Sequence, residues 1–86
     1  MSFEVPEGWN LAQSPQGDLL VRVFDRGDFV GAVSFVDSMV PVAEGMGHHP
    51  DLQISWKDVT VSLFTHSEGR VTEKDFELAR AINDLA

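Results

Sequence analysis

The chain has 86 residues, of which 43 % are hydrophobic, so we expect a single domain over residues 1–86 whose small core would gain stability from self-association. The absence of cysteine excludes disulfides and thiolate chemistry, and a net charge of −8 with six scattered basic residues argues against nucleic-acid binding. No uninterrupted apolar run reaches the roughly 20 residues of a membrane span, and residues 1–7 do not resemble a signal peptide, so we expect a cytoplasmic protein that does not bind membranes.

The first elements predicted along the chain form a β-hairpin after an irregular lead over residues 1–8. Residues 9–14 and 19–24 each alternate side chains as strands do, and Ser-Pro-Gln-Gly at residues 14–17 is typical of the turn between them. The apolar residues expected to share a strand face are Trp9 and Leu11 in the first strand and Leu19, Val21 and Val23 in the second.

An amphipathic helix is predicted next. Asp28 is a suitable N-cap, and the helix is expected to run to residue 44 or 46. Pro41 should kink the helix or end its regular part, and Gly45 and Gly47 should stop it just before His-His-Pro. The apolar residues that recur at helical spacing are Phe29, Val33, Val36, Val40 and Ala43.

A second hairpin is predicted from residues 52–56 and 59–66, with Lys57-Asp58 as its turn. A two-residue loop would pair Trp56 with Val59, and we therefore expect Trp56 in the core. In that register the apolar residues of both strands share one face: Leu52, Ile54 and Trp56 with Val59, Val61 and Leu63.

The last predicted element is a helix that follows a loop at residues 67–71. Thr72-Glu73-Lys74-Asp75 is typical of a capping box that opens a helix running to residue 86. The order ββαββα predicts an α+β fold, a four-stranded antiparallel sheet with two helices packed on one face. The expected buried stripe of the last helix is Leu78, Ala79, Ile82, Leu85 and Ala86.

All three histidines of the chain, His48, His49 and His66, lie between residues 44 and 75. Histidine titrates near neutral pH and is the usual general acid or base. Because the start of one hairpin strand lies beside the end of the other, we expect the three to converge at one end of the sheet. Convergence would also permit zinc, but the HxH, HxxxH and HExxH spacings are absent, so metal binding is not favoured.

Two carboxylates accompany the histidines, and each has a structural as well as a functional interpretation. Glu44 is either a solvated residue at a helix end or a partner that fixes a histidine tautomer. Asp75, at the third position of the last helix, is expected to cap that helix, which does not exclude a place in the site. From the residues alone we expect an acid–base site for a small ligand.

The spacing of these residues resembles the pterin-4a-carbinolamine dehydratase family, also called the dehydratase/dimerisation-cofactor fold. The resemblance covers residues 8–85 and includes Gly8-Trp9 and the segments VTVSLFTH and VTEKDFELARAI. The residues at the family's pattern positions are Glu44, His48-His49-Pro50, Trp56, His66 and Asp75.

The resemblance implies dehydration of 4a-hydroxytetrahydropterin to quinonoid dihydropterin, in the recycling of a tetrahydrobiopterin-type cofactor. Histidine acid–base catalysis would need neither a metal nor a bound cofactor. By resemblance, His48 and His66 would be the acid–base pair, and His49 would position the pterin. Glu44 and Asp75 would orient the histidines. The residues expected to line the pocket are Pro50, Thr65 and Ser67.

The chain also departs from its relatives. They usually carry a further helix before the first hairpin, which we expect to be missing here, with one face more exposed or covered by a partner chain. Arg70 stands where a second glycine is usual and Gly47 where a polar residue is common, so the pocket rim should differ.

The resemblance leaves an alternative function open. Some relatives act as dimerisation or assembly factors, so the chain could be a non-catalytic module that binds a protein partner. The complete histidine pattern favours the enzyme. Either function implies a homodimer or homotetramer formed through sheet edges.

Overall fold

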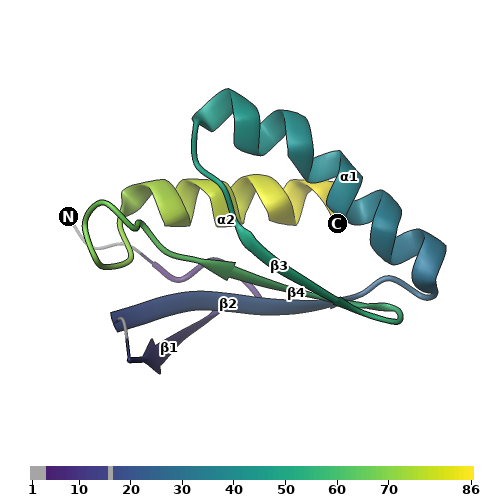
Figure 1. Ribbon diagram of the computed structural model, residues 1–86, viewed down its shortest axis with the longest axis horizontal. Helices are drawn as coiled ribbons and strands as arrows, with labels where there is room; N and C mark the ends of the chain where they lie inside the picture. The colour runs from purple at the N-terminus through teal and green to yellow at the C-terminus, as the bar shows by residue number, and fades with distance from the viewer. Residues whose placement is uncertain (1–3, 16) are drawn as a thin grey trace.

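The computed structural model describes residues 4–15 and 17–86, and its elements follow the predicted order ββαββα. The strands form one antiparallel sheet in the order β1-β2-β4-β3, and both helices lie over one face of it (Figure 1). The predicted α+β fold is therefore confirmed. The elements are β1 (Asn10–Ser14), β2 (Gly17–Asp25), α1 (Phe29–Met46), β3 (Asp51–Ser55), β4 (Asp58–Leu63) and α2 (Glu73–Leu85).

The first hairpin agrees with the prediction in its strands. Parts of the predicted lead and turn, residues 1–3 and 16, lie outside the described residues. Trp9 is buried and its indole N–H donates to Asn83 at 2.8 Å, which ties the start of the hairpin to α2. Leu11, expected on the same face, is instead largely exposed, because edge strand β1 extends beyond the cover of the helices.

The core lies between the helices and the two central strands. In β2 the inward-facing residues are Leu20 and Phe24, paired across the sheet with Leu63 and Val59 of β4. The face shared by Leu19, Val21 and Val23 is thus the open one, and Val23 is 57 % exposed. The core residues are Trp9, Leu20, Phe24, Ala32, Phe35, Met39, Val59, Val61, Leu63, Phe76, Leu78, Ala79 and Ile82.

Helix α1 begins and ends where predicted. The Asp28 carboxylate accepts the Gly31 amide N–H at 2.7 Å, and the helix continues through Pro41, which therefore does not end it. The predicted buried stripe is wrong in part, because α1 is apolar on more than one face and its contacts with α2 and β4 select another. The buried residues are Ala32, Phe35, Met39 and Ala43, whereas Phe29, Val33 and Val40 are exposed.

Helix α1 is also the only helix in the described residues that could cross a membrane by length and composition, with a mean hydropathy of 1.3 over 18 residues. The core helix of a globular domain meets the same criterion, and one face of α1 is packed in the core. The mean hydropathy of α1 meets the criterion although polar residues interrupt its apolar sequence, which is why a search for an uninterrupted apolar run did not find it. The expectation of no membrane binding stays a prediction.

The second hairpin turns one residue earlier than predicted. Ser55 pairs with Asp58, so the turn consists of Trp56 and Lys57 rather than Lys57 and Asp58. Trp56 is 67 % exposed with a φ of 53°, and the expectation that it lies in the core is wrong. The reason is local: tight two-residue hairpin turns need left-handed backbone, which places the indole outside the sheet.

The end of the chain follows the prediction closely. The backbone N–H of Thr72 donates to the Asp75 carboxylate at 2.8 Å, as a capping box requires, and α2 begins at Glu73. Leu78, Ala79 and Ile82 are buried as predicted. Leu85 is only partly buried and Ala86 is exposed beyond the helix end, because the last turn extends past the core.

Candidate active site

The C-terminal end of α1 positions the first histidine. The backbone N–H of Gly47 donates to the carbonyl of Glu44 at 3.2 Å, and that of His48 donates to the carbonyl of Ala43 at 3.2 Å. This pair of bonds is a Schellman motif, which needs a left-handed residue, and Gly47 has φ 61° and ψ 29°. The motif therefore fixes the backbone of His48 directly beyond the helix.

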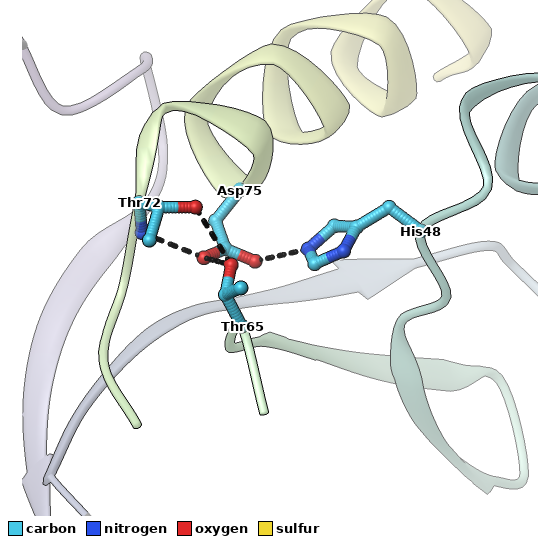
Figure 2. A network of polar contacts seen from close by, with 4 residues as sticks. All are labelled: His48, Thr65, Thr72 and Asp75. Carbon is cyan, nitrogen blue, oxygen red and sulfur yellow. Dashed lines mark hydrogen bonds and ion pairs between the residues drawn. The ribbon is translucent and has the colours of Figure 1, made fainter. Parts of the chain in front are cut away.

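Asp75 links three segments of the chain (Figure 2). One of its oxygens, Oδ2, accepts hydrogen bonds from the Thr72 backbone N–H at 2.8 Å and from the Thr65 hydroxyl at 2.7 Å. The other, Oδ1, lies 2.5 Å from Nε2 of His48. The carboxylate that caps α2 is thus also the partner of the first histidine.

The burial of Asp75 determines what this pair can do chemically. Its side chain is 0 % exposed, and a buried carboxylate must be matched by hydrogen bonds. Because an ionised carboxylate only accepts hydrogen bonds, Nε2 of His48 must carry the proton. The other ring nitrogen, Nδ1, is then free to accept a proton from a ligand.

The second histidine forms a separate pair. Nε2 of His49 lies 2.5 Å from Oε2 of Glu44, and both side chains are exposed. Glu44 therefore pairs with His49 and not with His48, which sequence spacing alone did not determine. Such an exposed pair contributes at most about 1 kcal/mol to stability.

The three histidines meet at one hollow of about 250 Å³. His66 follows the end of β4, which stops at Leu63 and is shorter than predicted, and its exposed ring packs edge-on against Phe64 at 5.1 Å. His48 is 11 % exposed there. The residues lining this hollow, called here the histidine hollow, are Gly47, His48, His49, Phe64, Thr65, His66, Ser67 and Lys74.

Two further hollows adjoin the histidine hollow. One of about 440 Å³ shares Thr65, Ser67 and Lys74 with it and extends to Arg70. The other, about 200 Å³, lies between α1 and β3, and it contains Pro50 together with Glu44 and His49. Pro50 thus lies beside the histidine hollow and not in its lining.

Trp56 lies at the turn, at the opposite end of the β3–β4 hairpin from the histidines (Figure 1). Within residues 4–15 and 17–86, no group of three or more histidine, cysteine, aspartate or glutamate side chains could hold a metal ion. His48 and His49 are bonded to different carboxylates instead.

Sequence reasoning missed two residues of the histidine hollow, Phe64 and Lys74, and treated Thr72 only as a helix cap. The position of Lys74 beside Asp75 in the first turn of α2 could have indicated its proximity. Nothing in the sequence indicated the contact between the hydroxyls of Thr65 and Thr72, because it depends on how the segment between β4 and α2 folds back on itself.

Together, this fold and site define a small α+β protein with three histidines lining one hollow and a buried aspartate bonded to one of them. The chain belongs to the pterin 4 alpha carbinolamine dehydratase family, whose model matches residues 2–85.

Relatives support the same family membership. A protein of Thermosynechococcus vestitus, provisionally named pterin-4-alpha-carbinolamine dehydratase, is 51 % identical over 79 residues, which cover 92 % of this chain and 79 % of the relative. A Sulfolobus acidocaldarius protein with the same provisional name is 46 % identical over 79 residues, covering 92 % and 82 %.

Two solved structures resemble the fold. The crystal structure of a transcriptional coactivator/pterin dehydratase from Brucella melitensis has a TM-score of 0.84 and 35 % identity, covering 93 % of this chain and 83 % of that one. A pterin dehydratase-like protein identified as a RuBisCO assembly factor in the alpha-carboxysome has a TM-score of 0.76, covering 99 % and 96 %. At 20 % identity, the second likeness concerns the fold alone.

Proposed function

We propose that this protein dehydrates 4a-hydroxytetrahydropterin to quinonoid dihydropterin and water, in the recycling of a tetrahydrobiopterin-type cofactor in the cytoplasm. The observation that carries the proposal is the convergence of His48, His49 and His66 on one hollow, with His48 bonded to buried Asp75, in a chain of this family. The reaction needs only the removal of a ring N–H proton and the protonation of the hydroxyl as its bond to carbon breaks, so histidines can perform it without a metal or cofactor.

The geometry suggests a division of roles between two of the histidines. His48 would act as the base: it accepts a pterin ring N–H proton at Nδ1, and the Asp75 carboxylate on Nε2 stabilises the resulting imidazolium. His66, which has no carboxylate partner among the described residues, would in its protonated form donate a proton to the departing 4a-hydroxyl. The second proton transfer releases water and completes the double bond.

The remaining site residues would hold the pterin. His49, oriented by Glu44, lines the same hollow on the side of α1 and would position the ring system. Ser67 lines both this hollow and the larger one beside it, and would contact the substrate. The Thr65 hydroxyl is already bonded to Asp75, so its contribution to the pocket wall would come from its methyl group.

The test is the rate of 4a-hydroxytetrahydropterin dehydration, followed by absorbance, for wild type, His48→Ala, His66→Ala and the double variant. Loss of a general acid or base typically costs 10²–10⁴-fold, so we expect the double variant to be slower by at least about 100-fold. Ser34→Ala, on the exposed side of α1, should match wild type. Circular dichroism verifies that each variant is folded. Folded wild-type protein without any acceleration would contradict the proposal.

The alternative function, a dimerisation or assembly module, rests on the exposed apolar surface of α1 and β3. The exposed residues of this surface are Phe29, Val30, Val33, Val40, Leu52, Ile54 and Trp56. A second copy beside edge strand β3 or another protein could cover it. We propose a homodimer or homotetramer formed through the sheet edges β1 and β3. A pterin titration separates the functions, because a module without a working pocket would not bind the pterin.

A further inference from the structure

We propose that Thr65 is a positioning residue that sets the protonation and orientation of His48 through Asp75, with Thr72 as the outer member of the same chain of hydroxyls. The catalytic consequence rests on the proposed function, because it requires His48 to act as a base. The proton arrangement itself does not, and it can be measured without any substrate.

The side chains of Thr65 and Asp75 are both buried. Thr65 is 5 % exposed and Asp75 0 %, so water cannot replace a hydrogen bond that either side chain loses. Both donors to Oδ2 of Asp75, the Thr65 hydroxyl and the Thr72 backbone N–H, approach from the side away from His48 (Figure 2). They hold one oxygen of the carboxylate and leave the other aimed at the imidazole.

The number of hydroxyl protons fixes the direction of the hydrogen bonds between Thr72, Thr65 and Asp75. The Thr65 hydroxyl oxygen lies 2.7 Å from Asp75 Oδ2 and 2.7 Å from the Thr72 hydroxyl oxygen. Thr65 has one hydroxyl proton and the carboxylate can only accept, so Thr65 donates to Asp75 and Thr72 donates to Thr65. In a buried chain each hydrogen bond polarises the next, which strengthens the donation to the carboxylate.

These hydrogen bonds act on His48 through the Asp75 carboxylate. Three donors, from Thr72, Thr65 and His48, stabilise the ionised form of Asp75. An ionised Asp75 keeps the imidazole proton on Nε2 and leaves the Nδ1 lone pair available. Without the Thr65 hydroxyl the carboxylate loses one donor and can rotate, and the imidazole is no longer held in one tautomer.

The hydroxyl can be tested apart from the backbone at this position. The Thr65 N–H donates to the Arg70 carbonyl at 3.1 Å, and the Thr65 carbonyl accepts the amide N–H groups of Glu68 and Gly69 at 3.0 and 2.9 Å. These bonds hold the turn that carries His66, and they do not involve the side chain. Thr65→Val, which keeps the shape and removes the hydroxyl, should therefore leave His66 in place.

The experiment measures full-length wild type, Thr65→Val, Thr65→Ser and Thr72→Val by ¹⁵N NMR of labelled histidine, across pH and without pterin. We expect the Nε2–H tautomer of His48 in wild type, a mixture of tautomers in Thr65→Val, restoration in Thr65→Ser, and a smaller change of the same kind in Thr72→Val. Thr60→Val, on the open face of the sheet, is the matched control and should resemble wild type.

Dehydratase assays on the same proteins measure the effect of each substitution on kcat and KM. Loss of an outer hydrogen-bond partner typically costs 10–100-fold, so Thr65→Val should lower kcat by at least about tenfold with little change in KM, and Thr65→Ser should recover most of it.

Unchanged His48 signals in folded Thr65→Val would overturn the proposal, as would no recovery in Thr65→Ser. If Thr65→Val does not fold, Thr72→Val provides the test. An unaltered His48 tautomer in that variant would also contradict the proposal. Inactive wild-type protein with the expected NMR behaviour would refute the proposed function and leave the positioning role of Thr65 supported.

Discussion

Asp75 shows how one side chain can serve both the fold and the site. The same carboxylate caps the start of α2 by accepting the backbone N–H of Thr72, and it also binds the ring of His48. The sequence identified both possibilities, because an aspartate at the third position of a helix is a cap and the family pattern includes it. It could not indicate that Thr65 lies on the opposite side of the carboxylate, which depends on the packing of loop against helix.

The pairing of carboxylates with histidines is a further limit at the level of single residues. Glu44 lies one helical turn before His48 in the sequence, yet it binds His49. The Schellman motif at Gly47 reverses the chain and turns the two neighbouring histidines toward different partners. Sequence spacing indicates only that Glu44 lies near both histidines. The left-handed backbone of Gly47 determines which histidine faces it.

Gly47 provides the prediction at this scale. An alanine there would meet no atom within 4 Å, so the whole cost comes from its left-handed backbone, about 1 kcal/mol. We expect Gly47→Ala to lower the free energy of unfolding by about that amount in urea, and to lower kcat because His48 follows directly. Gly45→Ala, inside α1 with equal space, should instead be neutral or stabilising. Equal stabilities of the two variants would contradict this account.

At the level of elements, the sequence predicted the order and placed the bounds within three residues, because caps and turns are local. It did not predict which face of α1 is buried, since apolar residues such as Val33 and Phe35 point to different sides of the helix. Contacts with α2 and β4, remote in sequence, made that selection. The one-residue shift of the second turn similarly moved Trp56 from the expected core to the surface.

An ion pair connects two of these elements. Lys57, in the β3–β4 turn, donates to Asp25 at the end of β2 at 2.8 Å. Hydrogen bonds from Lys57 and from the Gly27 amide hold the pKa of Asp25 below its ordinary value of 3.8, and the bond to Asp25 raises the pKa of Lys57 above 10.5. Each pKa shift implies a contribution to stability that depends on pH.

The sign follows for the aspartate. Because its pKa is lower in the folded state, its contribution is complete above the unfolded value of about 3.9 and is lost as the pH falls through the folded value. We expect Asp25→Asn to be less stable than wild type at neutral pH, with the difference disappearing as the pH falls through the lowered pKa of Asp25 in the folded state. Urea unfolding across pH measures this. Asp37→Asn, on the exposed side of α1, should show no such trend. A difference that stays constant with pH would refute the linkage.

At the level of the whole molecule, family membership was predictable because seven pattern residues lie at set gaps, whereas the way the surfaces are used was not. Exposed apolar side chains remain on α1 and β3, on a chain whose small core favours association. We therefore expect this surface to mediate self-association.

The corresponding variant is Val30→Glu with Val33→Glu, which places two charges on exposed positions of α1. Sedimentation should show a shift toward monomer, because burying an unpaired charge in an interface is costly, while circular dichroism remains unchanged. Val23→Glu is the control, because Val23 is also exposed and lies on the open face of the sheet. An unaltered oligomer in the double variant would exclude α1 from the interface.

The two tryptophans of the chain occupy opposite environments, one sealed against α2 and the other at a hairpin tip. Their fluorescence should therefore report on separate events. Emission from Trp9 should shift to longer wavelength when the core opens, and emission from Trp56 should shift to shorter wavelength when a partner covers it. With one tryptophan replaced at a time, a single spectrometer could follow unfolding and association independently, without any attached dye.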